Sequence, residues 1–149
     1  MPIKPENRAL YPKDWPALSR AARERAQWRC QHEGCTAKQY SVGRWLPDSL
    51  ARLRWKPHAD YAASYTEARQ MAAEYSFFLF GDGPVPSDES PVIVIVLTVA
   101  HLNHDPTDCR PENLAAMCQR HHLQYDQQHH NETAYATRMK ARGNLELPL

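Results

Sequence analysis

Two short pairs of metal-ligating side chains lie far apart in this chain of 149 residues. Four residues separate Cys30 from Cys35, and two residues separate Cys118 from His121. Thiolates and imidazoles supplied as two close pairs are the usual ligands of a tetrahedral structural zinc ion. Such a site restricts the fold strongly, because it joins distant parts of the chain and cannot exist in the unfolded state. We therefore predict a structural Zn²⁺ bound by these four residues.

Two other interpretations of the cysteines remain open from the sequence. Cys109 lies nine residues before Cys118 and is a rival fourth ligand, and the thiols could also be buried free cysteines. Thiols that stay reduced are typical of the cytosol. The start of the chain is polar and contains prolines, unlike a secretory signal, and no apolar run reaches the length of a membrane span. We therefore expect a cytoplasmic protein without a membrane span.

The clearest pattern of regular structure lies between residues 92 and 142. The β-branched run VIVIVLTV at 92–99 predicts a strand buried on both faces. LAAMC at 114–118 predicts a short second strand, and residues 120–142 predict a helix with a possible break near 131–133. Two strands followed by a helix therefore form the expected core.

The preceding residues are expected to belong to the same domain, because 149 residues suit one modest core. Residues 1–16 contain four prolines and predict an extended, poorly ordered lead-in. Composition and turn residues give the other predictions. These are a helix at 18–28, a short strand at 40–47, a helix at 59–75, an apolar stretch at 77–80 that packs on the core, and a loop at 81–91.

The stretch from His101 to His122 holds four histidines, two cysteines and two asparagines. Such side chains bind metals and transfer protons. Phosphodiester hydrolysis requires an activated water and stabilised charge on the phosphoryl and leaving oxygens. A neutral histidine suits the first task near pH 7, and a divalent ion suits the second. The stretch is therefore a candidate catalytic centre as well as part of the zinc site.

Several segments resemble the HNH family of nucleases, which share the ββα-metal fold. VLTVAHL resembles the strand that ends in a histidine, PENL resembles the asparagine loop, and CQRHHL resembles the start of the following helix. WRCQHEGC resembles the first zinc knuckle of many members, and CQRHH the second, with His121 in place of a cysteine. The resemblance implies an α+β fold with a ββα-metal core at 92–142, a structural zinc and a helical insertion at 47–80, in a phage or prophage type of member.

The resemblance also implies roles for individual residues. His101, at the end of a strand, would be the general base. Asn113 would hold the loop and the imidazole in position. His122, at the start of the helix, would ligate a divalent ion, Mg²⁺, Mn²⁺ or Ni²⁺, that touches the scissile phosphate.

One departure from the family pattern leaves the second ligand of this ion open. Many members have Asp or His immediately before the base, where this chain has Ala100. His104 is the obvious substitute. In a rival register His104 is the base and Asn103 a weak ligand, but His101 is preferred because its distance to Asn113 is nearer the family spacing. His129 and His130 are interpreted as solvated helix residues.

Charge is distributed unevenly along the chain. Residues 1–56 carry 12 Lys and Arg against five Asp and Glu, whereas the remainder is acidic. Such a basic third can lie on a phosphate backbone. The expected contacts come from Arg20, Arg23, Arg25, Arg29, Arg44, Arg52, Arg54 and Lys56. We expect DNA binding mainly through the backbone, with weak sequence specificity.

The first functional hypothesis is a metal-dependent DNA endonuclease of the HNH type that hydrolyses phosphodiester bonds. The alternative is a zinc-stapled nucleic-acid-binding module without catalytic activity, which Ala100 favours. A third hypothesis is a scaffold that uses the zinc fold for interaction alone.

Overall fold

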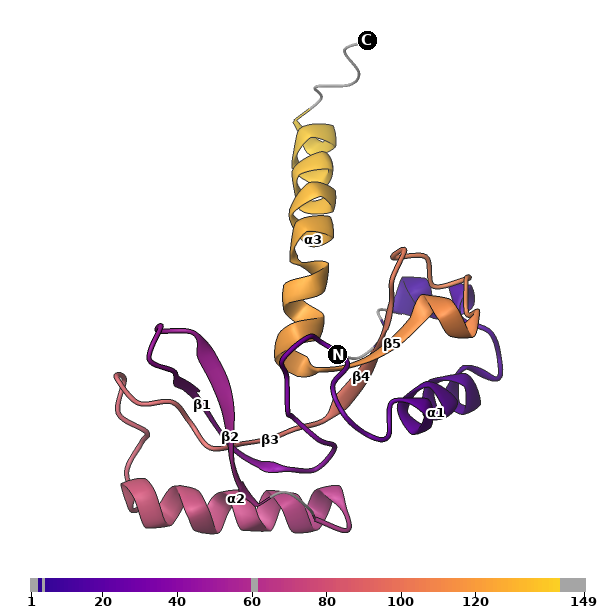
Figure 1. The fold of residues 1–149 in the computed structure, drawn as a ribbon. Helices are drawn as coiled ribbons and strands as arrows, with labels where there is room; N and C mark the ends of the chain where they lie inside the picture. Colours follow the sequence, from indigo (N-terminus) through magenta and orange to yellow (C-terminus); the bar gives the residue numbers. More distant parts are fainter. Residues whose placement is uncertain (1–2, 4, 60–61, 143–149) are drawn as a thin grey trace.

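The computed structural model describes residues 3, 5–59 and 62–142 (Figure 1). In chain order the elements are a 3-10 helix at Pro5–Leu10, α1 at Trp15–Arg25, β1 at Val42–Pro47, β2 at Leu53–Ala59, α2 at Tyr65–Phe80, β3 at Ile93–Val94, β4 at Leu97–His101, a 3-10 turn at Pro111–Asn113, β5 at Leu114–Cys118 and α3 at Gln119–Ala141.

Strands β4 and β5 and helix α3 form the ββα unit that the sequence predicts. The strands are antiparallel, with Leu97 opposite Cys118 and His101 opposite Leu114. Every residue of β5 is buried, and α3 follows it directly. The predicted α+β fold is confirmed. The register matters for function, because it places the end of β4 beside the start of β5 and the start of β4 beside the start of α3.

The apolar run at 92–99 is not a single strand, as predicted, but two strands with different partners. β3 pairs with β1, whereas β4 pairs with β5. Between them Ile95 is fully buried and exchanges backbone hydrogen bonds with Ser41 and Tyr40. The amide of Leu97 then donates to the side-chain oxygen of Gln39. Because both halves are equally apolar, the pattern carries no sign of this change of partner.

The predicted helical insertion at 47–80 contains a strand as well as a helix, which corrects that prediction. Strand β2 pairs along its length with β1, and the sheet order is β2-β1-β3. Residues 53–59 alternate between Leu, Trp and Pro on one side and Arg, Lys and His on the other, which is the period of a strand. Trp55 is buried on the inner side. Only residues 65–80 of the insertion form the helix α2.

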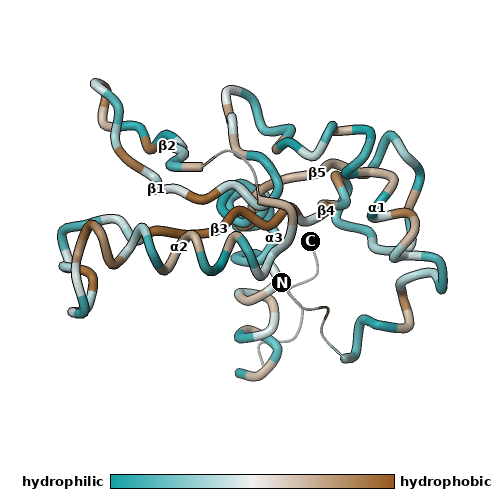
Figure 2. Tube along the Cα trace, turned by 90° about the horizontal axis from the view of Figure 1, so that it is seen from below, coloured by the Kyte–Doolittle hydropathy of each residue, from teal (hydrophilic) through white to brown (hydrophobic). Residues whose placement is uncertain are grey.

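Helix α2 begins later and ends later than the predicted helix at 59–75. Ser64 caps it by accepting a hydrogen bond from the amide of Glu67, which fixes its first turn. The apolar stretch 77–80 lies inside the helix rather than on the core: Phe77 is 59 % exposed and Phe78 is 81 % exposed. Figure 2 shows apolar segments along β3 and parts of α2.

The N-terminal segment is also more ordered than predicted. Residues 5–10 form a 3-10 helix, and α1 begins at Trp15 and ends at Arg25, before the predicted end at 28. Ala22 of α1 is buried together with Val99 and Leu114. Helix α1 therefore covers one face of the β4–β5 pair and closes the core of the ββα unit.

Helix α3 contacts the rest of the molecule only through its first turns. Among residues 119–141, all of which are described, none is buried, and the helix packs on β4 and β5 (Figure 1). The break predicted near 131–133 is absent. Within the described ranges, no helix combines the length and the apolar character needed to cross a membrane.

Candidate metal centres and active site

The four residues predicted to bind zinc come together. The ligand atoms of Cys30, Cys35, Cys118 and His121 all lie within 4.8 Å of one another. Nδ1 of His121 is 3.3 Å from Sγ of Cys118 and 3.6 Å from Sγ of Cys30. Zn–S bonds of about 2.3 Å and a Zn–N bond of about 2.0 Å at tetrahedral angles require a separation of about 3.5 Å. The arrangement therefore fits a zinc ion.

A tight knuckle brings the first cysteine pair to the second. Gly34 adopts a positive φ of 71°, and the amide of Cys35 donates to the carbonyl of His32. Gln31 docks this knuckle on β5: its amide donates to the carbonyl of Ala116, and its side-chain oxygen accepts from the amide of Ala116. These contacts place the knuckle beside the end of β5.

The thiols of this cluster form hydrogen bonds with one another. Hydrogen bonds with Cys118 and Cys35 hold the pKa of the Cys30 thiol far below its usual value. One thiolate is therefore readily available as a metal ligand. Cys109 does not belong to the cluster, because its sulfur lies 3.5 Å from Nε2 of His101 and 3.4 Å from the carbonyl of Pro106. The alternative in which Cys109 is the fourth zinc ligand is wrong.

His101 ends β4 in an enclosed position. Only 8 % of the residue is exposed. The indole of Trp15 stacks on the imidazole with a centroid distance of 4.9 Å, and the ring of Tyr11 approaches it edge-on. Burial lowers the pKa of His101, and this effect outweighs the opposing charges of Asp105 and Asp108. The imidazole is therefore neutral at neutral pH.

Asn113 clamps the loop that follows His101. Its Oδ1 accepts a hydrogen bond of 3.0 Å from the amide of Asn103. Its Nδ2 donates to Oδ1 of Asn103 and to the carbonyl of Asp108, at 2.9 Å and 2.7 Å. The carbonyl of Asn113 accepts from the amide of Leu102. The side chain thus holds the loop and makes no hydrogen bond to the imidazole of His101.

The carboxylate of Asp126, on α3, lies close to several of the histidines discussed in the sequence analysis. Its Oδ2 lies 3.1 Å from Nε2 of His122, one helical turn earlier, and its Oδ1 lies 3.2 Å from Nδ1 of His104. His130, one turn later, is 4.0 Å from the same carboxylate. His129 stacks on His104 with a centroid distance of 4.5 Å. His129 therefore borders this centre, whereas His130 lies at its edge with its side chain 54 % exposed, as a solvated helix residue does.

The hydroxyl of Thr98 on β4 contacts Nδ1 of His122 and also approaches the carbonyl of Met117, at 3.3 Å. In the tautomer that carries its proton on Nδ1, where Thr98 can accept it, Nε2 of His122 has a free lone pair. That lone pair faces the carboxylate of Asp126. Burial lowers the pKa of His122, although Asp126 opposes this effect.

Comparison with protein families adds an independent finding. A family model described as HNH endonuclease matches residues 80–124. This segment, which is less than half of the chain, is similar to the HNH endonuclease family. It contains β3, β4, the asparagine loop, β5 and the first turns of α3, and it confirms the resemblance found in the sequence. The comparisons with curated proteins and with solved structures gave no match.

The HNH segment includes His101, Asn113 and His122 but ends just before Asp126. Sequence reasoning overlooked Asp126 and Thr98. A carboxylate four residues after His122 on a predicted helix lies on the same face, and that spacing could have indicated Asp126. Thr98 could have been found only from the register of β4 against the start of α3.

Several of the basic residues expected to contact DNA already form ion pairs with carboxylates of the protein. These basic residues all precede the HNH segment in the sequence. Arg20 pairs with Glu24 and Arg44 with Glu89. Arg52 and Arg54 share Asp48, whose pKa is lowered chiefly by a hydrogen bond from the backbone of Arg52. The ion pairs of Arg20 and Arg52 are exposed and contribute little stability, so these two arginines can exchange a carboxylate for a phosphate. The side chain of Arg44 is only 13 % exposed. Arg29 lies beyond the end of α1 and shares no helical face with Arg25.

Proposed function

We propose that the protein is a metal-dependent DNA endonuclease that hydrolyses phosphodiester bonds. The observation that carries the proposal is the pairing of His122 with Asp126 at the junction of β4 and α3, inside and beside an HNH segment. Nε2 of His122 and Oδ2 of Asp126 lie 3.1 Å apart. With the imidazole protonated on Nδ1 toward Thr98, both atoms offer lone pairs at a separation that suits two ligands of one divalent ion.

His122 and Asp126 would hold this ion. When bound, the ion would supply Lewis-acid stabilisation of the phosphoryl and leaving oxygens. Ala100, immediately before His101, is fully buried and offers no ligand atom; Asp126 supplies the oxygen that this position lacks. His104 binds the other carboxylate oxygen of Asp126, and its role would be to orient that group, as partners of metal ligands commonly do.

His101 would be the general base. Cys109 donates its thiol proton to the carbonyl of Pro106, so its sulfur can accept the Nε2 proton of His101. Nδ1 is then the basic nitrogen. It takes a proton from the attacking water while the oxygen of that water bonds to phosphorus. The bond from phosphorus to the leaving sugar oxygen breaks, and this oxygen takes a proton from solvent.

Asn113 and the zinc cluster would act as supports. The three side-chain hydrogen bonds of Asn113 hold residues 103–108, which keeps His104 and Cys109 in place. Zn²⁺ at the Cys3His cluster would hold the knuckle at 30–35 against the start of α3. Both supports fix the relative position of β4 and α3, which carry the base and the cation ligands.

The alternative is a nucleic-acid-binding module without catalysis, which the absence of a ligand at Ala100 favours. Plasmid cleavage separates the two. Supercoiled plasmid is incubated with the protein and Mg²⁺, Mn²⁺ or Ni²⁺, and with His101→Ala protein purified in parallel. Nicked or linear product from the wild type and at least 100-fold less from His101→Ala supports the endonuclease. Equal cleavage by both would reject His101 as the base, and retention of plasmid on a gel without cleavage would support the binding module.

A further inference from the structure

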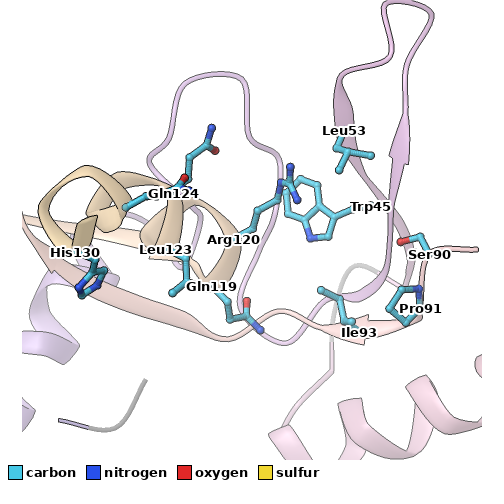
Figure 3. A pocket seen from close by; sticks show the side chains of 11 residues that line it. Trp45, Leu53, Ser90, Pro91, Ile93, Gln119, Arg120, Leu123, Gln124 and His130 are labelled. Atoms are coloured by element: carbon cyan, nitrogen blue, oxygen red, sulfur yellow. The ribbon is translucent and has the colours of Figure 1, made fainter. Parts of the chain in front are cut away.

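A long groove lies on the face of α3 next to the candidate active site. It encloses about 1000 Å³ and runs between the start of α3 and the β1–β2 hairpin with the segment that leads into β3 (Figure 3). This volume lies at the upper end of the usual range of ligand sites, about 300–1,000 Å³. Part of the lining is apolar: Leu53 and Leu123 are exposed and face the groove from opposite sides.

The polar residues of the groove suit an anionic partner with hydrogen-bonding edges. None of the residues that line it is acidic. Arg120 lies over the ring of Trp45 at 5.3 Å, and within the described part of the chain its guanidinium has no carboxylate partner. Gln124 and Gln127 are exposed and present amide groups to the groove. A flat cation held on an indole, amide groups and a partly apolar lining are the chemistry that binds exposed nucleobases and their phosphates.

The groove is continuous with the candidate active site. His130 lines its end and also lies 4.0 Å from the carboxylate of Asp126. A DNA strand whose phosphate reaches the divalent ion proposed at Asp126 can therefore continue along the face of α3 into the groove. Duplex DNA hides the faces of its bases in the stack, whereas the groove offers contact to those faces.

We propose that this groove binds unpaired nucleotides of the strand next to the cleaved bond, so that the preferred substrate has a single-stranded segment. The inference rests on the proposed endonuclease function for its orientation relative to the cut. The binding itself does not depend on catalysis and can be measured without it.

The test is fluorescence anisotropy with a labelled 12-nucleotide single strand and with the same sequence as a blunt duplex, on zinc-loaded His101→Ala protein without added divalent ion. We expect at least tenfold tighter binding of the single strand. In the same background, Arg120→Glu and Leu53→Asp are each expected to weaken single-strand binding at least tenfold and duplex binding by less than threefold. Leu53→Asp alters the opposite wall of the groove, so that a folding defect of one variant leaves the other informative.

Arg138→Glu is the matched control, because it makes the same charge change on an exposed part of α3 outside the groove. An equal loss of single-strand affinity in Arg138→Glu and Arg120→Glu would show that only the net charge of the protein matters, which would overturn the inference. Unchanged single-strand affinity in both groove variants would also overturn the inference. The groove would then be a candidate site for a protein partner. The same groove substitutions are also placed in the wild-type background; plasmid cleavage that persists there together with such a result would reject the groove alone. Specific single-strand binding by a wild type that cleaves nothing would reject the proposed endonuclease alone.

Discussion

Nε2 of His122 and Oδ2 of Asp126 lie 3.1 Å apart on consecutive turns of α3. Thr98 contacts the opposite nitrogen of the imidazole, so the tautomer protonated on Nδ1 turns a free lone pair toward the carboxylate. The register of β4 and β5 places Thr98, the helix places Asp126, and the chemistry of the pair indicates a divalent cation.

Replacement of Asp126 by Asn should remove the negative ligand and keep its shape. We expect cleavage to fall at least 100-fold and the apparent affinity for Mn²⁺, measured by calorimetry, to fall at least tenfold. Zinc content should remain that of the wild type. Glu132→Gln is the control, because it neutralises an exposed carboxylate on the same helix. An Asp126→Asn protein that cleaves at the wild-type rate would exclude Asp126 as a ligand.

Thr98→Val should act on the same ion from the other side of His122. The change keeps the size of the side chain but removes the hydroxyl that fixes the tautomer of the imidazole. Loss of such a partner typically costs 10–100-fold in metal affinity. We expect the concentration of Mn²⁺ needed for half-maximal cleavage to rise by this factor, with the maximal rate largely restored at saturation. Thr133→Val, whose hydroxyl binds only backbone carbonyls of α3, should leave both quantities unchanged.

The rate of cleavage should depend on pH through His101. Burial lowers the pKa of this imidazole below its ordinary value of about 6.5, and only the neutral form can accept a proton. At saturating metal the rate should therefore hold down to a pH below 6.5 and fall about tenfold per pH unit beneath the pKa. Trp15→Ala opens the imidazole to water and should move this acid limb to higher pH. If the acid limb of the pH–rate profile has the same midpoint in Trp15→Ala as in the wild type, it reports the titration of a group other than His101.

Zinc should be required for folding, and the four cysteines should differ in this respect. Purified protein is expected to contain one equivalent of zinc, measured by mass spectrometry of the metal. Cys30→Ala should lose the metal and the cooperative thermal transition, because a structural zinc contributes several kcal/mol or more. Cys109→Ala is the matched control and should retain both, since its sulfur lies at His101. Loss of zinc in Cys109→Ala would contradict the ligand set.

Asn113→Ala should loosen the loop between β4 and β5. The variant leaves the amide of Asn103 and the carbonyl of Asp108 without partners, and each lost hydrogen bond of this kind costs about 1 kcal/mol. We expect the free energy of unfolding to fall by about 2–3 kcal/mol, measured by urea denaturation, and the amide of Asn103 to exchange faster with solvent. Protection of that amide equal to the wild type would show that the clamp is dispensable.

The local patterns predicted those parts of the molecule whose chemistry lies in short stretches. The spacings of Cys30–Cys35 and Cys118–His121 indicated the metal cluster, and the order of the HNH motifs indicated the ββα unit. Strand β2 was missed because the Ala-rich and Arg-rich composition around it favoured a helix, whereas pairing with β1 decides its structure. The division of β3 from β4 was missed because a change of partner leaves no trace in an apolar run.

The candidate site was predicted less completely than the fold. His101, Asn113 and His122 could be named from the motif, but the partner of His122 could not, because Ala100 occupies the expected ligand position. Asp126 becomes evident only when α3 turns it toward His104 and His122. Likewise, Cys109 resembles a zinc ligand by residue type, and only the path of the loop brings it to His101.

We propose that His122 and Asp126 bind a divalent ion beside His101, separately from the zinc cluster. The most direct measurement is an anomalous difference map from crystals of the zinc-loaded protein soaked in Mn²⁺, collected at the manganese and zinc absorption edges. The account predicts a zinc peak among the Cys3His ligands and a manganese peak that touches both Nε2 of His122 and Oδ2 of Asp126. A manganese peak elsewhere, or none at saturating concentration, would contradict it.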